Sequence, residues 1–153
     1  LSRQRPRVRV PSLAPLLLKR RWPFRVNKCL FMIFPDLLEE NLRIVFCGTA
    51  PSRASAESRA YYAHPGNRFY KTLYEIGLTP RRLSPQEFPE LLAYGIGLTD
   101  VNKRESGNDT DLTRAGFAPE ALREKIMRYR PRYLAFTSKR AAAEALEDAL
   151  SAI

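Results

Sequence analysis

One stretch of the sequence, residues 42–52, limits what this chain can fold into more than any other. Residues 42–47 are mostly apolar and include β-branched side chains, and after Gly48 the sequence continues in small and polar residues. This pattern is typical of a buried strand that ends in a tight loop. In α/β proteins, ligands bind just beyond the carboxyl ends of such strands. Residues 48–52 are therefore the first candidate for a binding site, although an ordinary strand and turn would produce the same pattern.

The positive charge of the chain is concentrated at one end. The 153 residues carry a net charge of +10, and nine of the 26 basic residues lie within residues 1–31, which contain no acidic residue. Residues 32–153 hold 17 basic and 16 acidic residues, so their overall charge does not identify a partner. The length suits one domain, and no apolar run approaches the roughly 20 residues of a membrane span.

The basic segment 1–31 allows three interpretations. It could be an arm that binds nucleic acid, a targeting peptide, or sequence that is not part of the functional protein. The third is favoured because the chain begins with Leu1, while Met32 directly precedes the first regularly patterned residues. We therefore expect a leader over residues 1–31 and a domain over residues 32–153.

The pattern from Met32 onward predicts strands that alternate with helices. Such an order implies a parallel sheet with right-handed crossovers, and hence a three-layer α/β/α fold with a short central sheet. The sequence ends within the last predicted helix, so we expect the domain to be incomplete. The predicted strands are 42–47, 96–101 and 132–137; the predicted helices are 67–76, 85–94, 119–129 and 138 onward; single helical turns are predicted at Pro35 and at 54–59, and a loop at 102–118.

The cysteine content gives no sign of a metal site or a cofactor. Two cysteines, Cys29 and Cys47, cannot form a metal site alone. Cys47 lies within a predicted strand, where a small buried thiol is the usual role. We expect a monomer in the reducing cytoplasm that acts at the nucleoid.

Three motifs together make the sequence specific. They are FCGTAPS at 46–52, AHPGNRF at 63–69 and YGIGLTD at 94–100. Their combination resembles the mismatch-specific uracil-DNA glycosylases of the Mug and thymine-DNA glycosylase family over residues 42–137. The resemblance implies monofunctional excision of uracil or a related damaged or mismatched base from double-stranded DNA, as the first step of base-excision repair. It implies no metal, no cofactor and no covalent lysine intermediate, and the sequence around Lys71 and Lys103 shows no sign of a buried partner for either lysine.

The resemblance also implies a set of residues that bind the base after it is flipped out of the duplex. Tyr62 stacks on the base, His64 either braces its loop or touches DNA, and Asn67 either caps the following helix or recognises the base. Arg59 and Arg68 are candidates for phosphate contacts. The loop that lines the base pocket consists of Gly48, Thr49, Ala50 and Ser52, together with the Ser55 hydroxyl.

The sequence departs from the family at the residue that matters most for the chemistry. The family commonly has asparagine at the position of Ala50, where it orients the attacking water, and a methyl group cannot do this. Asp100 is the only acidic residue at the carboxyl end of a predicted strand within the matched region. We expect Asp100 to replace the missing asparagine as the catalytic group, although an aspartate that merely forms a turn is equally compatible with this position.

A second departure concerns the other half of the DNA-binding cleft. The family carries a later loop containing Pro-Ser-Gly that enters the DNA, and the sequence ends before such a segment. We therefore expect a domain that is truncated before the second DNA-binding motif. The alternative to a glycosylase is a catalytically inactive module that binds damaged bases or DNA, as a consequence of Ala50 or of truncation.

Overall fold

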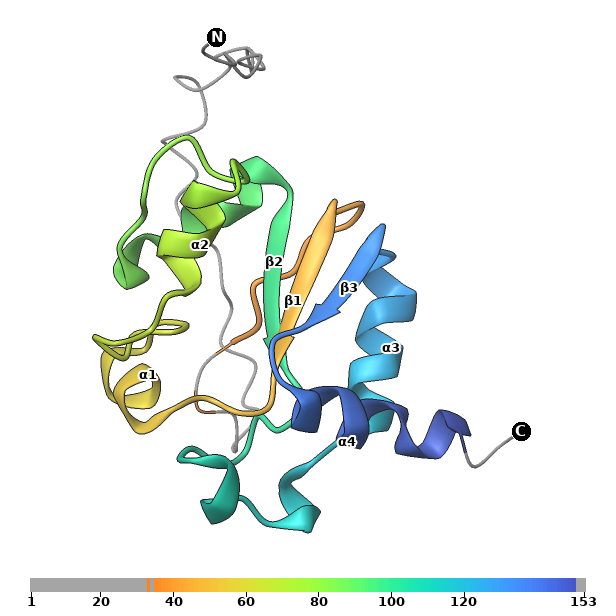
Figure 1. Ribbon diagram of the computed structural model, residues 1–153. Helices are drawn as coiled ribbons and strands as arrows, with labels where there is room; N and C mark the ends of the chain where they lie inside the picture. The colour runs from red at the N-terminus through yellow and green to blue at the C-terminus, as the bar shows by residue number, and fades with distance from the viewer. Residues whose placement is uncertain (1–32, 34, 151–153) are drawn as a thin grey trace, which may run out of the picture.

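The structure is a computed structural model that describes residue 33 and residues 35–150, with side chains described as far as residue 147. Its centre is a parallel sheet of three strands in the order β2-β1-β3 (Figure 1). These strands, β1 (Ile44–Gly48), β2 (Ile96–Asp100) and β3 (Tyr133–Phe136), confirm the three predicted from the sequence. The predicted leader 1–31 lies outside the described residues.

Helices cover both faces of the sheet and produce three layers (Figure 1). The side chains of β1 alternate between the two faces, so Phe46 packs towards one layer of helices and Cys47 towards the other. This confirms the predicted α/β/α fold. One layer consists of α1 (Arg53–Ser58), α2 (Phe69–Glu75) and the 3-10 helix η1 (Pro85–Tyr94), and the other of α3 (Pro119–Tyr129) and α4 (Lys139–Leu150).

The helix predicted over 85–94 has the predicted ends but is a 3-10 helix throughout. Ser84 and Glu87 form a capping box at its start, and Gly95 ends it with a left-handed φ of 71°. Pro89 lies inside this helix and has no backbone N–H to donate to the preceding turn. The loop predicted over 102–118 contains two further short 3-10 turns, η2 (Asp109–Asp111) and η3 (Arg114–Gly116).

The helical turn predicted at Pro35 is wrong. Leu37 instead forms an isolated antiparallel bridge with Leu98 of β2, with two backbone hydrogen bonds of 2.9 Å. Extended backbone is favoured here because it buries the Leu37 side chain in the core beside the sheet. The bridge also brings Asp36 next to β2. There Asp36 belongs to a buried polar cluster that also contains Tyr61, Asp100 and Lys103. None of the described helices is long and apolar enough to span a bilayer.

Candidate active site

A pocket of about 180 Å³ lies at the carboxyl ends of β1 and β2, beside the loop that the sequence singles out. It brings together most of the predicted site residues, but His64 is not part of its lining. Sequence reasoning missed Pro51, Tyr61, Asp109 and Thr137, because nothing in their local sequence distinguishes them as site residues. The lining residues are Gly48, Thr49, Ala50, Pro51, Ser52, Ser55, Tyr61, Tyr62, Asn67, Asp100, Asp109 and Thr137.

Asp100 ends β2 and lies directly opposite Gly48, the last residue of β1. Its side chain is 4% exposed, and its Oδ1 lies so close to Gly48 that a Cβ at that position would stand only 2.6 Å away. The other oxygen, Oδ2, accepts a hydrogen bond of 3.1 Å from Lys103 Nζ. Burial raises the pKa of Asp100 above that of an ordinary aspartate, and the positive charge of Lys103 only partly opposes this effect.

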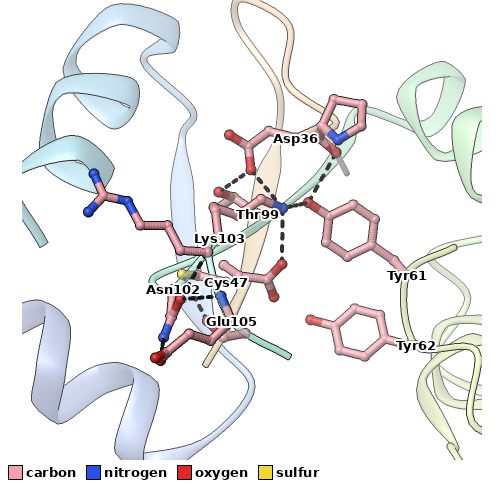
Figure 2. Close-up of polar contacts among 12 residues, drawn as sticks. Asp36, Cys47, Tyr61, Tyr62, Thr99, Asn102, Lys103 and Glu105 are labelled. Carbon is pink, nitrogen blue, oxygen red and sulfur yellow. Dashed lines mark hydrogen bonds and ion pairs between the residues drawn. The ribbon is translucent and has the colours of Figure 1, made fainter. Parts of the chain in front are cut away.

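Lys103 is buried beside Asp100, a partner of which the sequence around this lysine shows no sign. Its side chain is 8% exposed, and Nζ lies at the centre of the polar cluster, between Asp36 and Tyr61 (Figure 2). Nζ donates to the Tyr61 hydroxyl at 2.8 Å and forms ion pairs with Asp36 Oδ1 at 3.3 Å and Asp100 Oδ2 at 3.1 Å. No local signal could have revealed this, because two of the partners lie more than 40 residues away along the chain.

Asp36, which does not line the pocket, anchors this cluster. Its Oδ2 pairs with Lys125 of α3 at 2.6 Å, and its Oδ1 accepts a hydrogen bond of 2.8 Å from Thr99. Burial favours a higher pKa for Asp36, but the charges of Lys103 and Lys125 and the hydrogen bonds outweigh burial and hold its pKa below the ordinary value. The surroundings therefore lower the pKa of Asp36 and raise the pKa of Asp100. Of these two carboxyl groups, only that of Asp100 lines the pocket.

Tyr62 forms an aromatic wall of the pocket. Its ring stacks on Phe69, with the centroids 4.0 Å apart and the planes inclined by 24°. Its hydroxyl donates to Thr137 Oγ1 at 3.4 Å, and Thr137 in turn donates to the carbonyl of Cys47. Burial raises the pKa of the Tyr62 hydroxyl, so it remains protonated and able to donate. Tyr61, the preceding residue, is buried in the core and also lines the pocket.

Hydroxyl groups cross-link the loop that follows β1. Thr49 Oγ1 lies 2.7 Å from Ser138 Oγ at the start of α4, and Ser52 caps α1 by accepting the Ser55 N–H at 3.2 Å. Ser55 Oγ accepts hydrogen bonds from the Ser52 hydroxyl and from the Ala63 N–H. The Ser55 hydroxyl therefore ties the loop to the residue after Tyr62, which fixes the two sides of the pocket relative to each other.

His64 and Asn67 are exposed and form hydrogen bonds within their own loop. His64 Nδ1 accepts the Gly66 N–H at 3.1 Å, and Asn67 Oδ1 accepts the N–H of Phe69, the first residue of α2, at 2.9 Å. Asn67 also lines the pocket. Arg59 and Arg68, the candidates for phosphate contacts, are exposed at the two ends of the segment that joins α1 to α2. Within residues 33 and 35–150, no group of three or more His, Cys, Asp or Glu side chains could hold a metal ion.

The Cys47 thiol is buried in the sheet, as the sequence predicts. Burial raises the pKa of this thiol, so little of the reactive thiolate forms at neutral pH. We expect iodoacetamide to modify Cys47 only after the protein is unfolded, as measured by peptide mapping with mass spectrometry. The same reaction in denaturant is the control, and equal rates of Cys47 modification under both conditions would contradict the buried position.

Two comparisons with known proteins agree with this fold. The family model of the Uracil DNA glycosylase superfamily matches residues 35–152. The chain is also similar to a solution NMR structure of a protein from Methanosarcina acetivorans that is described as a "putative Uracil DNA glycosylase". The two have 25% sequence identity and a TM-score of 0.54, and the match covers 77% of this chain and 76% of the other.

Proposed function

The chain belongs to the uracil DNA glycosylase superfamily, and on that premise we propose that it excises uracil or a related damaged or mismatched base from double-stranded DNA. The three sequence motifs favour the mismatch-specific group within this superfamily. The enzyme acts as a monomer at the nucleoid and begins base-excision repair. The single observation that carries the proposal is the buried carboxylate of Asp100 beside Gly48 in a pocket of about 180 Å³.

In the proposed reaction the target nucleotide leaves the duplex and its base enters the pocket. The bond between the base and C1′ of the sugar breaks, and its electron pair leaves with the base. The oxygen of a water molecule bonds to C1′, and Asp100 accepts a proton from this water. The negative carboxylate also stabilises the positive charge that develops on the sugar.

The pocket lining also offers a surface on which the base can stack and backbone groups that can bind its polar edge. The Tyr62 ring offers a flat surface on which a base can stack, and Phe69 supports that ring from behind. The glycine at position 48 lets the base approach the main chain closely, and the backbone groups of Gly48, Thr49 and Ser52 are the proposed contacts to its polar edge. His64 and Asn67 hold the adjoining loop.

Excision is tested with a single-turnover assay on a duplex that contains one uracil, at enzyme concentrations above the dissociation constant. We expect abasic sites, detected by alkaline cleavage of a labelled strand, together with free uracil. The second candidate function is a binding module without catalysis, favoured by Ala50 at the position where the family has asparagine. Such a module shifts the duplex in a gel but produces no abasic sites, and this outcome would replace our proposal.

The aromatic wall gives a separate expectation for binding. Replacing Tyr62 with alanine removes the stacking surface and should weaken binding to uracil-containing DNA by about 10- to 100-fold, since stacking on a base contributes roughly 1–3 kcal/mol. Tyr62→Phe keeps the ring and loses only the hydrogen bond to Thr137, so its affinity should stay within a few-fold of the wild type. Fluorescence anisotropy with a labelled duplex measures both variants, and equal affinities for Tyr62→Ala and Tyr62→Phe would rule out stacking.

A further inference from the structure

We propose that Lys103 is a positioning residue for the catalytic step, in which its ammonium group orients Asp100 and supports the negative charge of that carboxylate. The inference rests on the proposed function of Asp100 and adds a residue to it. Asp100 lines the pocket, whereas Lys103 does not. Lys103 can therefore act only through Asp100, and not as a nucleophile towards the sugar.

The geometry assigns different tasks to the two oxygens of Asp100. Oδ2 is held by Lys103 at 3.1 Å, and Oδ1 lies beside Gly48, at the pocket. One contact therefore fixes the side chain and leaves the other oxygen in place to accept a proton from water. A carboxylate without this contact could rotate, and its charge would be buried without a partner beside it.

Lys103 is itself held by two further residues. Asp36 and the Tyr61 hydroxyl contact the same ammonium group at 3.3 and 2.8 Å, and the Tyr61 ring lies 4.9 Å from Nζ (Figure 2). Lys125 of α3 pairs with the other oxygen of Asp36, Oδ2. Positive and negative groups therefore alternate from α3 to the pocket, in the order Lys125, Asp36, Lys103 and Asp100. The alternating charges balance, which makes a buried ionised Asp100 tolerable in this fold.

The arrangement predicts opposite effects of two substitutions on the pH profile. Removing the positive charge of Lys103 raises the pKa of Asp100 further, whereas removing the negative charge of Asp36 lowers it. Other titratable groups also surround this carboxyl group, but both substitutions leave them in place. They are Cys47 on β1, Tyr61 and Tyr62 after α1, Lys125 on α3 and Asp109 of η2.

The test measures the single-turnover rate of uracil release against pH for the full chain and its variants. The acid limb of the pH profile is the range in which the rate falls as Asp100 becomes protonated. With Lys103→Met, this limb should move to higher pH by about 1–3 units, the effect expected of a charge at this distance. The rate at pH 7 should fall at least about tenfold. With Asp36→Asn, the acid limb should move to lower pH. A purely structural role for the cluster would lower the rate at every pH and leave the acid limb in place.

Arg81 provides a matched control, because it also pairs with two carboxylates, Glu87 and Glu90, but on the surface. Arg81→Met should leave the rate and the pH profile unchanged. If Lys103→Met does not fold, as judged by circular dichroism, Lys103→Gln takes its place in the same test, because it also removes the positive charge. An acid limb that stays in place in the folded variants overturns the role of Lys103. An Asp100→Asn variant with the wild-type rate overturns the catalytic role of Asp100, whereas a wild-type protein that releases no uracil overturns the proposed function itself.

Discussion

Replacing Asp100 with asparagine is expected to reduce the single-turnover rate of uracil release by about 10²- to 10⁴-fold, the usual contribution of a group that moves a proton in the transition state. The amide has nearly the same size and still lines the pocket, but it cannot accept a proton from water. Because burial raises the pKa of Asp100, the fold favours the uncharged form of this side chain. The uncharged amide should therefore keep the melting temperature at pH 7 close to that of the wild type.

The pH dependence of the wild-type enzyme should report the same group. The rate should fall as the pH drops through the pKa of Asp100, because protonation removes the base, and this acid limb should lie above the ordinary aspartate value of 3.8. Asp111→Asn is a suitable control, since Asp111 is exposed and is not part of the pocket lining. Full activity of Asp100→Asn would assign Asp100 to a turn and leave the chemistry to another residue.

Replacing Gly48 with alanine is expected to have the second large effect. A Cβ at this position would stand 2.6 Å from Asp100 Oδ1. This is too close for a carbon and an oxygen that are not bonded to each other, so either the strand or the carboxylate has to move. Forcing an extra methyl group into a packed site costs roughly 1–3 kcal/mol. We expect a lower melting temperature together with a large loss of uracil release, because the displaced carboxylate is the proposed catalytic group.

The clash can be separated from other effects by a double-mutant cycle. In an Asp100→Ala background the carboxylate is gone, so Gly48→Ala should cost much less stability than it does in the wild type. Gly66→Ala is the control for the substitution itself, since a Cβ there would make only ordinary contacts of 3.4 Å with His64. An equal cost of Gly48→Ala in both backgrounds would show that Asp100 does not set the requirement for glycine.

The proposed arrangement of Gly48 and Asp100 accounts for a member of this superfamily that has alanine at position 50. The loop after β1 has the features that we propose bind a base, namely Gly48 for close approach and Ser52 and Ser55 for its shape. The group proposed for the chemistry lies across the pocket on β2, where the register of the parallel strands brings it opposite Gly48. Alanine at position 50 and a buried aspartate on β2 can belong to one site because both strands end at the same edge of the sheet.

The strands and the helix ends follow from local sequence. The apolar runs before Gly48 and Asp100 are recognisable as buried strands, and Ser84 and Gly95 mark the ends of their helix because capping depends on residues next to one another in the chain. Prediction failed at Leu37, where a contact with Leu98 of β2 decided the backbone conformation. It also missed the 3-10 character of residues 85–94.

The sequence by itself thus determined the fold class, the position of the pocket loop and the candidacy of Asp100, because each depends on short-range periodicity or on the ends of strands. Only the tertiary structure decided that β1 lies between β2 and β3, and that Lys103 is buried between Asp36, Tyr61 and Asp100. A lysine has the same local signature whether it is solvated or buried. Its burial depends on partners that strand order and the Leu37–Leu98 bridge bring together from distant parts of the chain.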